Sequence, residues 1–158
     1  MISVTWNIEP TVQALRSLID RMRDLRPAWK SVVLYLRKAT QATFASQGGR
    51  IGAAWAPLSP DYAYQKERVY PGMPILRASD GMYKSLVDEG AENSIVEIGL
   101  QDLTYGTKDR KARWHQDGTD RMPQRKILDV VAEDRRQIKA IVRAHLQRQA
   151  TISGFEVL

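Results

Sequence analysis

The strongest constraint on the fold is a helical spacing of apolar residues that is broken once, at Pro27. Residues that recur every three or four positions lie on one face of a helix. They are Val12, Leu15, Leu18, Ile19, Met22 and Leu25 before the proline, and Trp29, Val32, Val33, Leu36, Thr40 and Phe44 after it. Proline ends a helix and is also favoured in the first turn of the next one. The pattern therefore predicts two helices, one from Pro10 with a buried stripe and one from Pro27 to Gly48, forming a hairpin or a kinked rod.

The two large aromatics of the second helix, Trp29 and Phe44, have an alternative use as platforms on which nucleic-acid bases stack. Aromatic residues at helical spacing more commonly face the core. We therefore assign them to the core.

Strand patterns occur before the two helices and in the middle of the chain. Residues 2–8 alternate apolar and polar side chains, and so do residues 94–100, which we expect to pair with residues 84–89 as an antiparallel hairpin. Residues 79–86 are expected to begin with a cap and form a brief helical turn. Further along, residues 127–131 are expected to form a strand or a lead-in to the core, and Glu133 to begin a long helix. Residues 151–158 are expected to form a final strand. The predicted class is α+β, with N-terminal helices and a long C-terminal helix packed on a small, mainly antiparallel sheet.

Residues 50–78 lose this periodicity and contain four of the prolines. We expect an extended arm or long loop, with at most a short helix over residues 61–68 that begins after Ser59 and Pro60. An apolar side chain on such an arm needs a pocket to cover it, either on its own chain or on a neighbour. Trp55, Leu58 and Tyr62 are therefore predicted to be the side chains that dock the arm.

Residues 105–130 join a strand to the last helix and carry a dense group of cations. The basic residues are Lys108, Arg110, Lys111 and Arg113, followed directly by Trp114 and His115. Each buried charge would need its own partner, so this density predicts an exposed loop that projects from the body while Trp114 holds its base. Gly118 is expected to adopt a positive φ in a capped turn. The basic residues and Trp114 complete the predicted interface.

Catalytic and metal sites have little support in the sequence. His115, Asp117 and Asp120 offer one nitrogen and two oxygens, but their spacing matches no zinc or calcium motif. The other histidine, His145, lies at the edge of a helical stripe, where a packing role is more common than a ligand role. No phosphate-binding loop or nucleophile elbow is present. We predict no enzyme activity, no cofactor and no metal, and keep as an alternative a small hydrolase or metal-dependent nuclease that uses His115 with Asp117 or Asp120.

A chain of 158 residues is long enough for one domain with its own core, so we assign residues 1–158 to a single domain. Its 24 basic and 18 acidic residues give a formal charge of +6, which favours an acidic partner, either DNA or an anionic protein surface. There is no cysteine, and no apolar run has the length of a membrane span, so we expect a protein made inside the cell with no membrane partner.

Several short motifs, each weak singly, follow one another along the chain. In chain order they are Trp55-Ala-Pro-Leu-Ser-Pro-Asp-Tyr-Ala, Ile75-Leu-Arg-Ala-Ser-Asp-Gly-Met, Val96-Glu-Ile-Gly, Tyr105, His115-Gln-Asp-Gly and Met122-Pro-Gln-Arg-Lys-Ile-Leu. Their order and spacing, over about residues 10–147, resemble the phage virion morphogenesis family, the tail completion proteins of P2-like and Mu-like phages. Two departures from the family pattern are the insertion of residues 106–114 and the replacement of the usual proline and phenylalanine by Lys126 and Ile127.

The resemblance implies a structural virion protein at the head-to-tail junction, made in the cytoplasm of the bacterial host. It implies a homo-oligomeric ring that contacts connector or neck proteins and tail tube or terminator proteins, with DNA in the channel as a further partner. The alternative from another class is a small basic nucleic-acid-binding protein, which requires the basic residues to converge on one surface with exposed aromatics.

Overall fold

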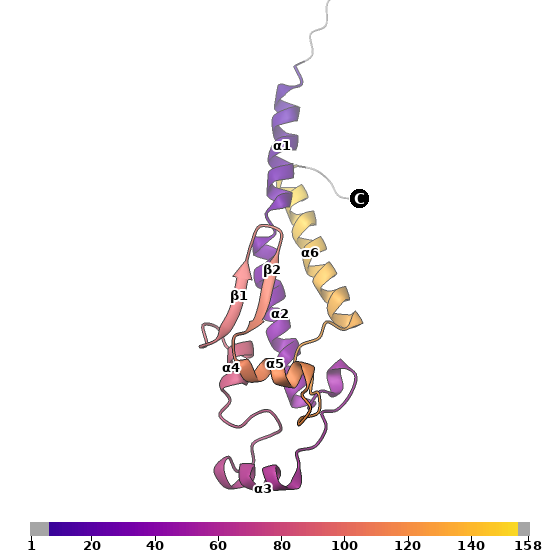
Figure 1. Cartoon of the computed structure of the whole chain (residues 1–158). Coiled ribbons are helices and arrows are strands. Elements are labelled where there is room, and N and C mark those ends of the chain that lie inside the picture. The colour runs from indigo at the N-terminus through magenta and orange to yellow at the C-terminus, as the bar shows by residue number, and fades with distance from the viewer. Residues whose placement is uncertain (1–6, 155–158) are drawn as a thin grey trace, which may run out of the picture.

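The computed structural model describes residues 7–154, and its elements follow one another as α1, α2, a short 3-10 helix η1, α3, α4, β1, β2, α5 and α6. The class is α+β, as the sequence predicts. Figure 1 shows α1 and α3 at opposite ends of the molecule, with the sheet and α6 alongside α2 between them. The strand predicted for residues 2–8 falls mostly outside the described residues, and residues 7 and 8 are not in a strand.

Helices α1 (Glu9–Arg23) and α2 (Arg26–Ala45) form a kinked rod, with α1 extending beyond the body (Figure 1). The break occurs at Asp24, which has an extended backbone. The amide of the next residue, Leu25, donates a hydrogen bond of 2.8 Å to the carbonyl of Leu100. The predicted buried stripe of α1 is wrong: no residue of this helix is buried, and Leu15 and Ile19 are 42% and 49% exposed. The spacing is helical, but most of α1 lies beyond the body that would have covered the stripe.

Helix α2 supplies the central wall of the core, including Val32, Val33 and Phe44. It ends at Ala45, and Gly48 then turns the chain with a φ of 89°. A side chain at Gly48 would meet the Trp55 ring at 2.5 Å. Glycine is therefore required here both for the left-handed backbone and for the close approach of Trp55.

The sheet has two strands, β1 (Ser94–Ile98) and β2 (Leu103–Thr107), paired antiparallel with Ser94 opposite Thr107 and Ile98 opposite Leu103. The predicted partner for β1, residues 84–89, is wrong because most of that segment belongs to helix α4 (Gly81–Val87). Met82, Leu86 and Val87 are buried together on α4, which extends the helical turn predicted within residues 79–86 to Val87. The short turn after Ile98 makes residues 103–107 the nearer partner.

The core lies where α2, α4 and α5 meet. Its buried cluster is Phe44, Trp55, Met82, Leu86, Val87, Ala112 and Ile127. The Phe44 ring meets the Trp55 ring edge-on with centroids 5.2 Å apart, and Trp55 Nε1 donates to the carbonyl of Lys126 at 2.7 Å. Residues 127–131 are a lead-in to α6 and not a strand; Ile127 is buried in the core, whereas Asp129 and Val130 are exposed.

Helix α6 (Ala132–Ile152) contacts α2 and α1. His145 is buried, and its Nε2 lies 3.0 Å from the carbonyl of Asp24 at the kink of the rod. The cations of α6 are exposed: Arg135, Arg136, Lys139, Arg143 and Arg148. Of the predicted final strand, residues 151 and 152 continue α6 and residues 155–158 lie outside the described part of the chain. Among the described residues, no helix has the length and apolar character to cross a membrane.

Two predicted loops contain helices. Residues 50–78 include the end of η1 (Gly49–Ile51) and all of α3 (Pro60–Val69), which begins after Ser59 as the sequence predicts. Residues 105–130 include α5 (Arg110–Asp117), so the basic stretch is a helix and not a projecting loop. The side chain of Asp109 accepts from the amide of Lys111 at 2.9 Å and caps α5, a signal that the density of positive charge obscured.

Candidate functional site

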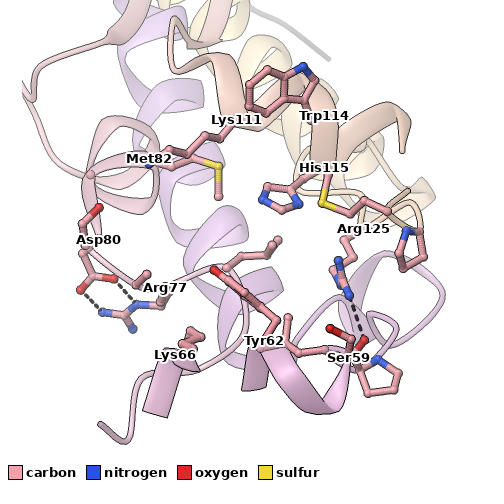
Figure 2. A pocket seen from close by; sticks show the side chains of 18 of the residues that line it. Ser59, Tyr62, Lys66, Arg77, Asp80, Met82, Lys111, Trp114, His115 and Arg125 are labelled. Carbon is pink, nitrogen blue, oxygen red and sulfur yellow. Dashed lines mark hydrogen bonds and ion pairs between the residues drawn. The ribbon is translucent and has the colours of Figure 1, made fainter. Parts of the chain in front are cut away.

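Two stretches predicted separately from the sequence meet at one cavity of about 720 Å³. Leu58 and Tyr62 line it from the arm and α3, while Lys111 and Trp114 line it from α5. The segment that leads into α4 and the loop after α5 complete the walls (Figure 2). A cavity of this size is in the range that proteins use to bind ligands.

Gln116 fixes the loop after α5 that forms one wall. Its Oε1 accepts from the amides of Ile127 and Leu128 at 3.0 and 3.1 Å, and its Nε2 donates to the Leu128 carbonyl at 2.7 Å. Gly118 ends α5 with a φ of 76°, as predicted, so the chain can turn back toward the cavity. Gln116, the second residue of the His-Gln-Asp-Gly motif, therefore has a structural role.

Two cations lie buried in the cavity wall, and neither pairs with a carboxylate within residues 7–154. Arg125 is 4% exposed and donates from Nε to the carbonyl of Ala56 at 2.8 Å and from Nη2 to that of Pro57 at 2.9 Å. Lys66 is 7% exposed and donates to the carbonyls of Met73 and Pro74, the latter at 3.0 Å. Carbonyls satisfy the donors but leave the positive charges uncompensated. Sequence reasoning missed both residues, since neither a lone lysine on a short helix nor the arginine of a motif indicates burial.

The one acidic residue of the cavity wall is already paired. Asp80 accepts from Arg77 Nε and Nη2, each at 2.8 Å, and the bonds from Arg77 hold the pKa of Asp80 below its usual value. The Arg77 guanidinium also lies 4.1 Å from the Tyr83 ring centroid, within cation–π range. The cavity therefore carries an excess of positive charge.

His115 points into the cavity from α5, between Met82 and Arg125 (Figure 2). Burial lowers its pKa, and the nearby positive charge of Arg125 lowers it further, which favours the neutral ring. Its Nδ1 is buried with no hydrogen-bond partner among the described residues. Asp117, which the metal alternative needs, instead lies 3.7 Å from Arg113 on the exposed face of α5. Within residues 7–154, no three histidine or acidic side chains gather in a way that would hold a metal ion.

The remaining predicted residues lie elsewhere. Trp55 docks inside its own chain, in the core. Lys108, Arg110 and Arg113 are exposed near or on α5, outside the cavity lining. The structure thus places Leu58, Tyr62, Lys111 and Trp114 together and separates them from the other four.

A second charged group, also missed from the sequence, joins α6 to α2 and η1. Asp134 is 1% exposed and accepts from Tyr35 Oη at 2.7 Å, from the amide of Val131 at 3.0 Å and from Arg50 Nη2. Burial raises the pKa of Asp134, but these hydrogen bonds outweigh it and lower the pKa overall. The group lines a smaller cavity of about 420 Å³. Every partner is internal to the fold, so its role is structural.

A comparison with protein-family models finds one that matches residues 6–147 and is described as the phage virion morphogenesis family. No curated protein and no solved structure matches the chain.

Proposed function

The chain belongs to the phage virion morphogenesis family, and on that premise we propose that it acts in tail completion and head-to-tail joining as one subunit of a ring. The ring stands at the neck or tail end of the virion. Its subunits contact one another, the connector or neck proteins on one side, and tail tube or terminator proteins on the other. The role is structural and involves no catalysis.

The observation that carries the proposal is the uncovered apolar stripe of α1. Leu15 and Ile19 are exposed, Val12, Leu18 and Met22 are only partly covered, and α6 is the main element that contacts α1 among the described residues. An isolated helix of 15 residues is marginal in water and depends on packing of its apolar face. In a ring of identical subunits, a neighbouring copy is available at every position to cover that face. A second copy of this chain is therefore the proposed occupant.

The gain from covering the stripe can be worked out from the exposed fractions. Full burial of a leucine or isoleucine contributes about 1.5–3 kcal/mol. Because Leu15 and Ile19 are a little under half exposed, covering both adds roughly 1.5–3 kcal/mol per contact. That corresponds to about a 10- to 100-fold change in the association constant.

The experiment is sedimentation of the purified protein over a range of concentrations. Replacing both Leu15 and Ile19 with Gln should lower the association constant about 10- to 100-fold, with helix content retained. A matched control replaces Ala14 and Ser17, which are exposed on the same helix, with Gln and should assemble like the parent. A parent that stays monomeric at all concentrations, or a Leu15/Ile19 variant that assembles like the control, would remove α1 as the subunit contact.

The exposed cations of α5 support a second contact, with an acidic face of the connector or tail or with DNA in the channel. Lys108, Arg110, Lys111 and Arg113 are exposed, and within the described residues one of them, Arg113, forms an ion pair, with Asp117 at 3.7 Å. Attraction at such a site is screened within about 8 Å at physiological salt. It acts mainly on the rate of joining.

Replacing all four cations with Ser should leave ring formation intact but slow the joining of heads to tails, with the deficit shrinking as salt is raised. Joining rates equal to those of the parent at low salt would exclude a role for these residues. The competing function, a nucleic-acid-binding protein, predicts instead that the same variant loses affinity for duplex DNA in a fluorescence anisotropy titration.

A further inference from the structure

We propose that the cavity between α3, α4 and α5 binds a peptide segment of an adjoining virion protein, one in which a carboxylate side chain lies next to a large apolar side chain. The inference rests on the proposed function in that it takes the partner to be another virion component. It concerns a different surface from the α1 stripe and shares only Lys111 with the four exposed cations.

The charge of the cavity selects the carboxylate. Lys66 and Arg125 are buried in its wall and bonded only to backbone carbonyls, while Lys111 and Arg121 lie exposed at its rim. Asp80 is occupied by Arg77. A buried cation without a counter-charge is destabilising, and an acidic ligand group would relieve that penalty. A neutral or basic segment would not.

The rest of the lining selects an apolar neighbour for that carboxylate. Leu58, Leu76, Met82 and Met122 form much of the wall, and methionine adapts its shape to different ligand side chains. Figure 2 shows Tyr62 and His115 extending into the cavity from opposite sides. A phosphodiester backbone has no group that would cover such apolar walls, so the lining favours a peptide over nucleic acid.

The position of the cavity indicates a partner other than the neighbouring copy. It adjoins α3, at the end of the molecule opposite α1 (Figure 1). A subunit can therefore use α1 for its neighbour in the ring while the cavity remains accessible. Tyr62 and Trp114 are both about half exposed, which leaves aromatic surface available at the cavity for an incoming chain.

The test is an NMR titration of the full chain, labelled with ¹⁵N, against two blocked tripeptides. Acetyl-Phe-Glu-Leu-amide should shift the Trp114 indole and the backbone amides of α3 and α5. Acetyl-Phe-Gln-Leu-amide, which has the same shape without the charge, should bind at least about tenfold more weakly because it leaves the cations uncompensated. Equal binding of the two peptides, or no shift with either, would overturn the proposal.

Variants locate the binding within the cavity. Lys66→Gln and Arg125→Gln should each reduce affinity for the Glu peptide about tenfold and narrow its difference from the Gln peptide. Because both residues are buried and either variant can fail to fold, Tyr62→Ala provides a second test at an exposed wall position, with Tyr64→Ala as its matched control on the same helix outside the lining. Binding that survives Tyr62→Ala as well as it survives Tyr64→Ala would place the peptide elsewhere.

Ring assembly separates this inference from the proposed function. The Leu15/Ile19 variant should lose assembly and keep peptide binding, whereas Tyr62→Ala should keep assembly and lose peptide binding and head-to-tail joining. A short DNA duplex that displaces the Glu peptide from the same amides would identify nucleic acid as the occupant and refute the proposal.

Discussion

Asp134→Ala should be among the most destabilising single changes in this chain. The carboxylate is 1% exposed and accepts hydrogen bonds from Tyr35, Arg50 and the amide of Val131, so removing it leaves three donors without their acceptor. Breaking a buried ion pair in this way costs about 3–5 kcal/mol. The Arg50 side chain is 20% exposed and can regain some solvation, so we expect the lower end, about 3 kcal/mol. For a chain of this size that lowers Tm by about 6–12 °C.

Urea unfolding followed by tryptophan fluorescence measures the change directly, at a fixed low protein concentration because ring formation would add to apparent stability. Asp129→Ala is the control: Asp129 lies 3.5 Å from Lys126 with both side chains over 40% exposed, and its loss should matter by no more than about 0.5 kcal/mol. In a double-variant cycle with Arg50→Ala, the stability lost by the double variant should be smaller than the sum of the two single-variant losses by at least about 1 kcal/mol. Single-variant losses that add fully in the double variant, or an Asp134→Ala variant as stable as Asp129→Ala, would refute the assignment of Asp134 and Arg50 as a stabilising buried pair.

The contribution of Asp134 to folding stability should also depend on pH. The folded-state pKa of Asp134 is lowered by its hydrogen bonds, so its contribution is fully present above the unfolded value of 3.8 and is lost as the pH falls through the folded-state pKa. The parent should therefore lose stability more steeply than Asp134→Ala as the pH is reduced below about 4. Parallel acid unfolding curves would contradict this linkage.

Three further changes test the core around α2. Gly48→Ala should destabilise the fold by about 2–4 kcal/mol because of its positive φ and its 2.5 Å approach to Trp55, whereas Gly49→Ala should be nearly neutral, as thermal unfolding of the pair will show. Trp55→Ala should cost about 3–5 kcal/mol in the dissociated subunit, measured by urea unfolding followed by circular dichroism; a change below 1 kcal/mol with assembly lost would make Trp55 an intersubunit residue instead. Tyr105→Phe should cost about 1–3 kcal/mol in the same assay by leaving the carbonyl of Leu86 without its donor, and an unchanged midpoint would contradict that bond.

Local signals located most of the helices before any tertiary information. The apolar spacing, Pro27, Pro60 and the turn at Gly118 all act through the residue itself and its neighbours within about one helical turn. The same limit explains the errors. The Asp109 cap was also a local signal, but we read the surrounding cations as a loop. Residues 84–89 were assigned as the partner of residues 94–100 without a strand pattern of their own, although Met82 and Leu86 have a helical spacing.

The candidate site was only half predictable. Leu58, Tyr62, Lys111 and Trp114 were indicated by being apolar on an irregular arm or basic and aromatic on a polar stretch, but nothing in their order stated that the two groups share a cavity. Lys66 and Arg125 gave no signal, because burial of a cation depends on which carbonyls the fold brings to it.

By itself, the sequence determined the α+β class, the helices from Pro10 to Phe44 and beyond Glu133, and the order of motifs that marks the family, since these depend on local hydrogen bonding and spacing. Tertiary structure alone decided that β2 pairs with β1, that the stripe of α1 is left uncovered, and that Asp134 meets Arg50 from 84 residues away. A helical period states that one face is apolar and cannot state what covers it. That choice belongs to contacts between segments far apart in the chain, and they exist only once the whole fold has formed.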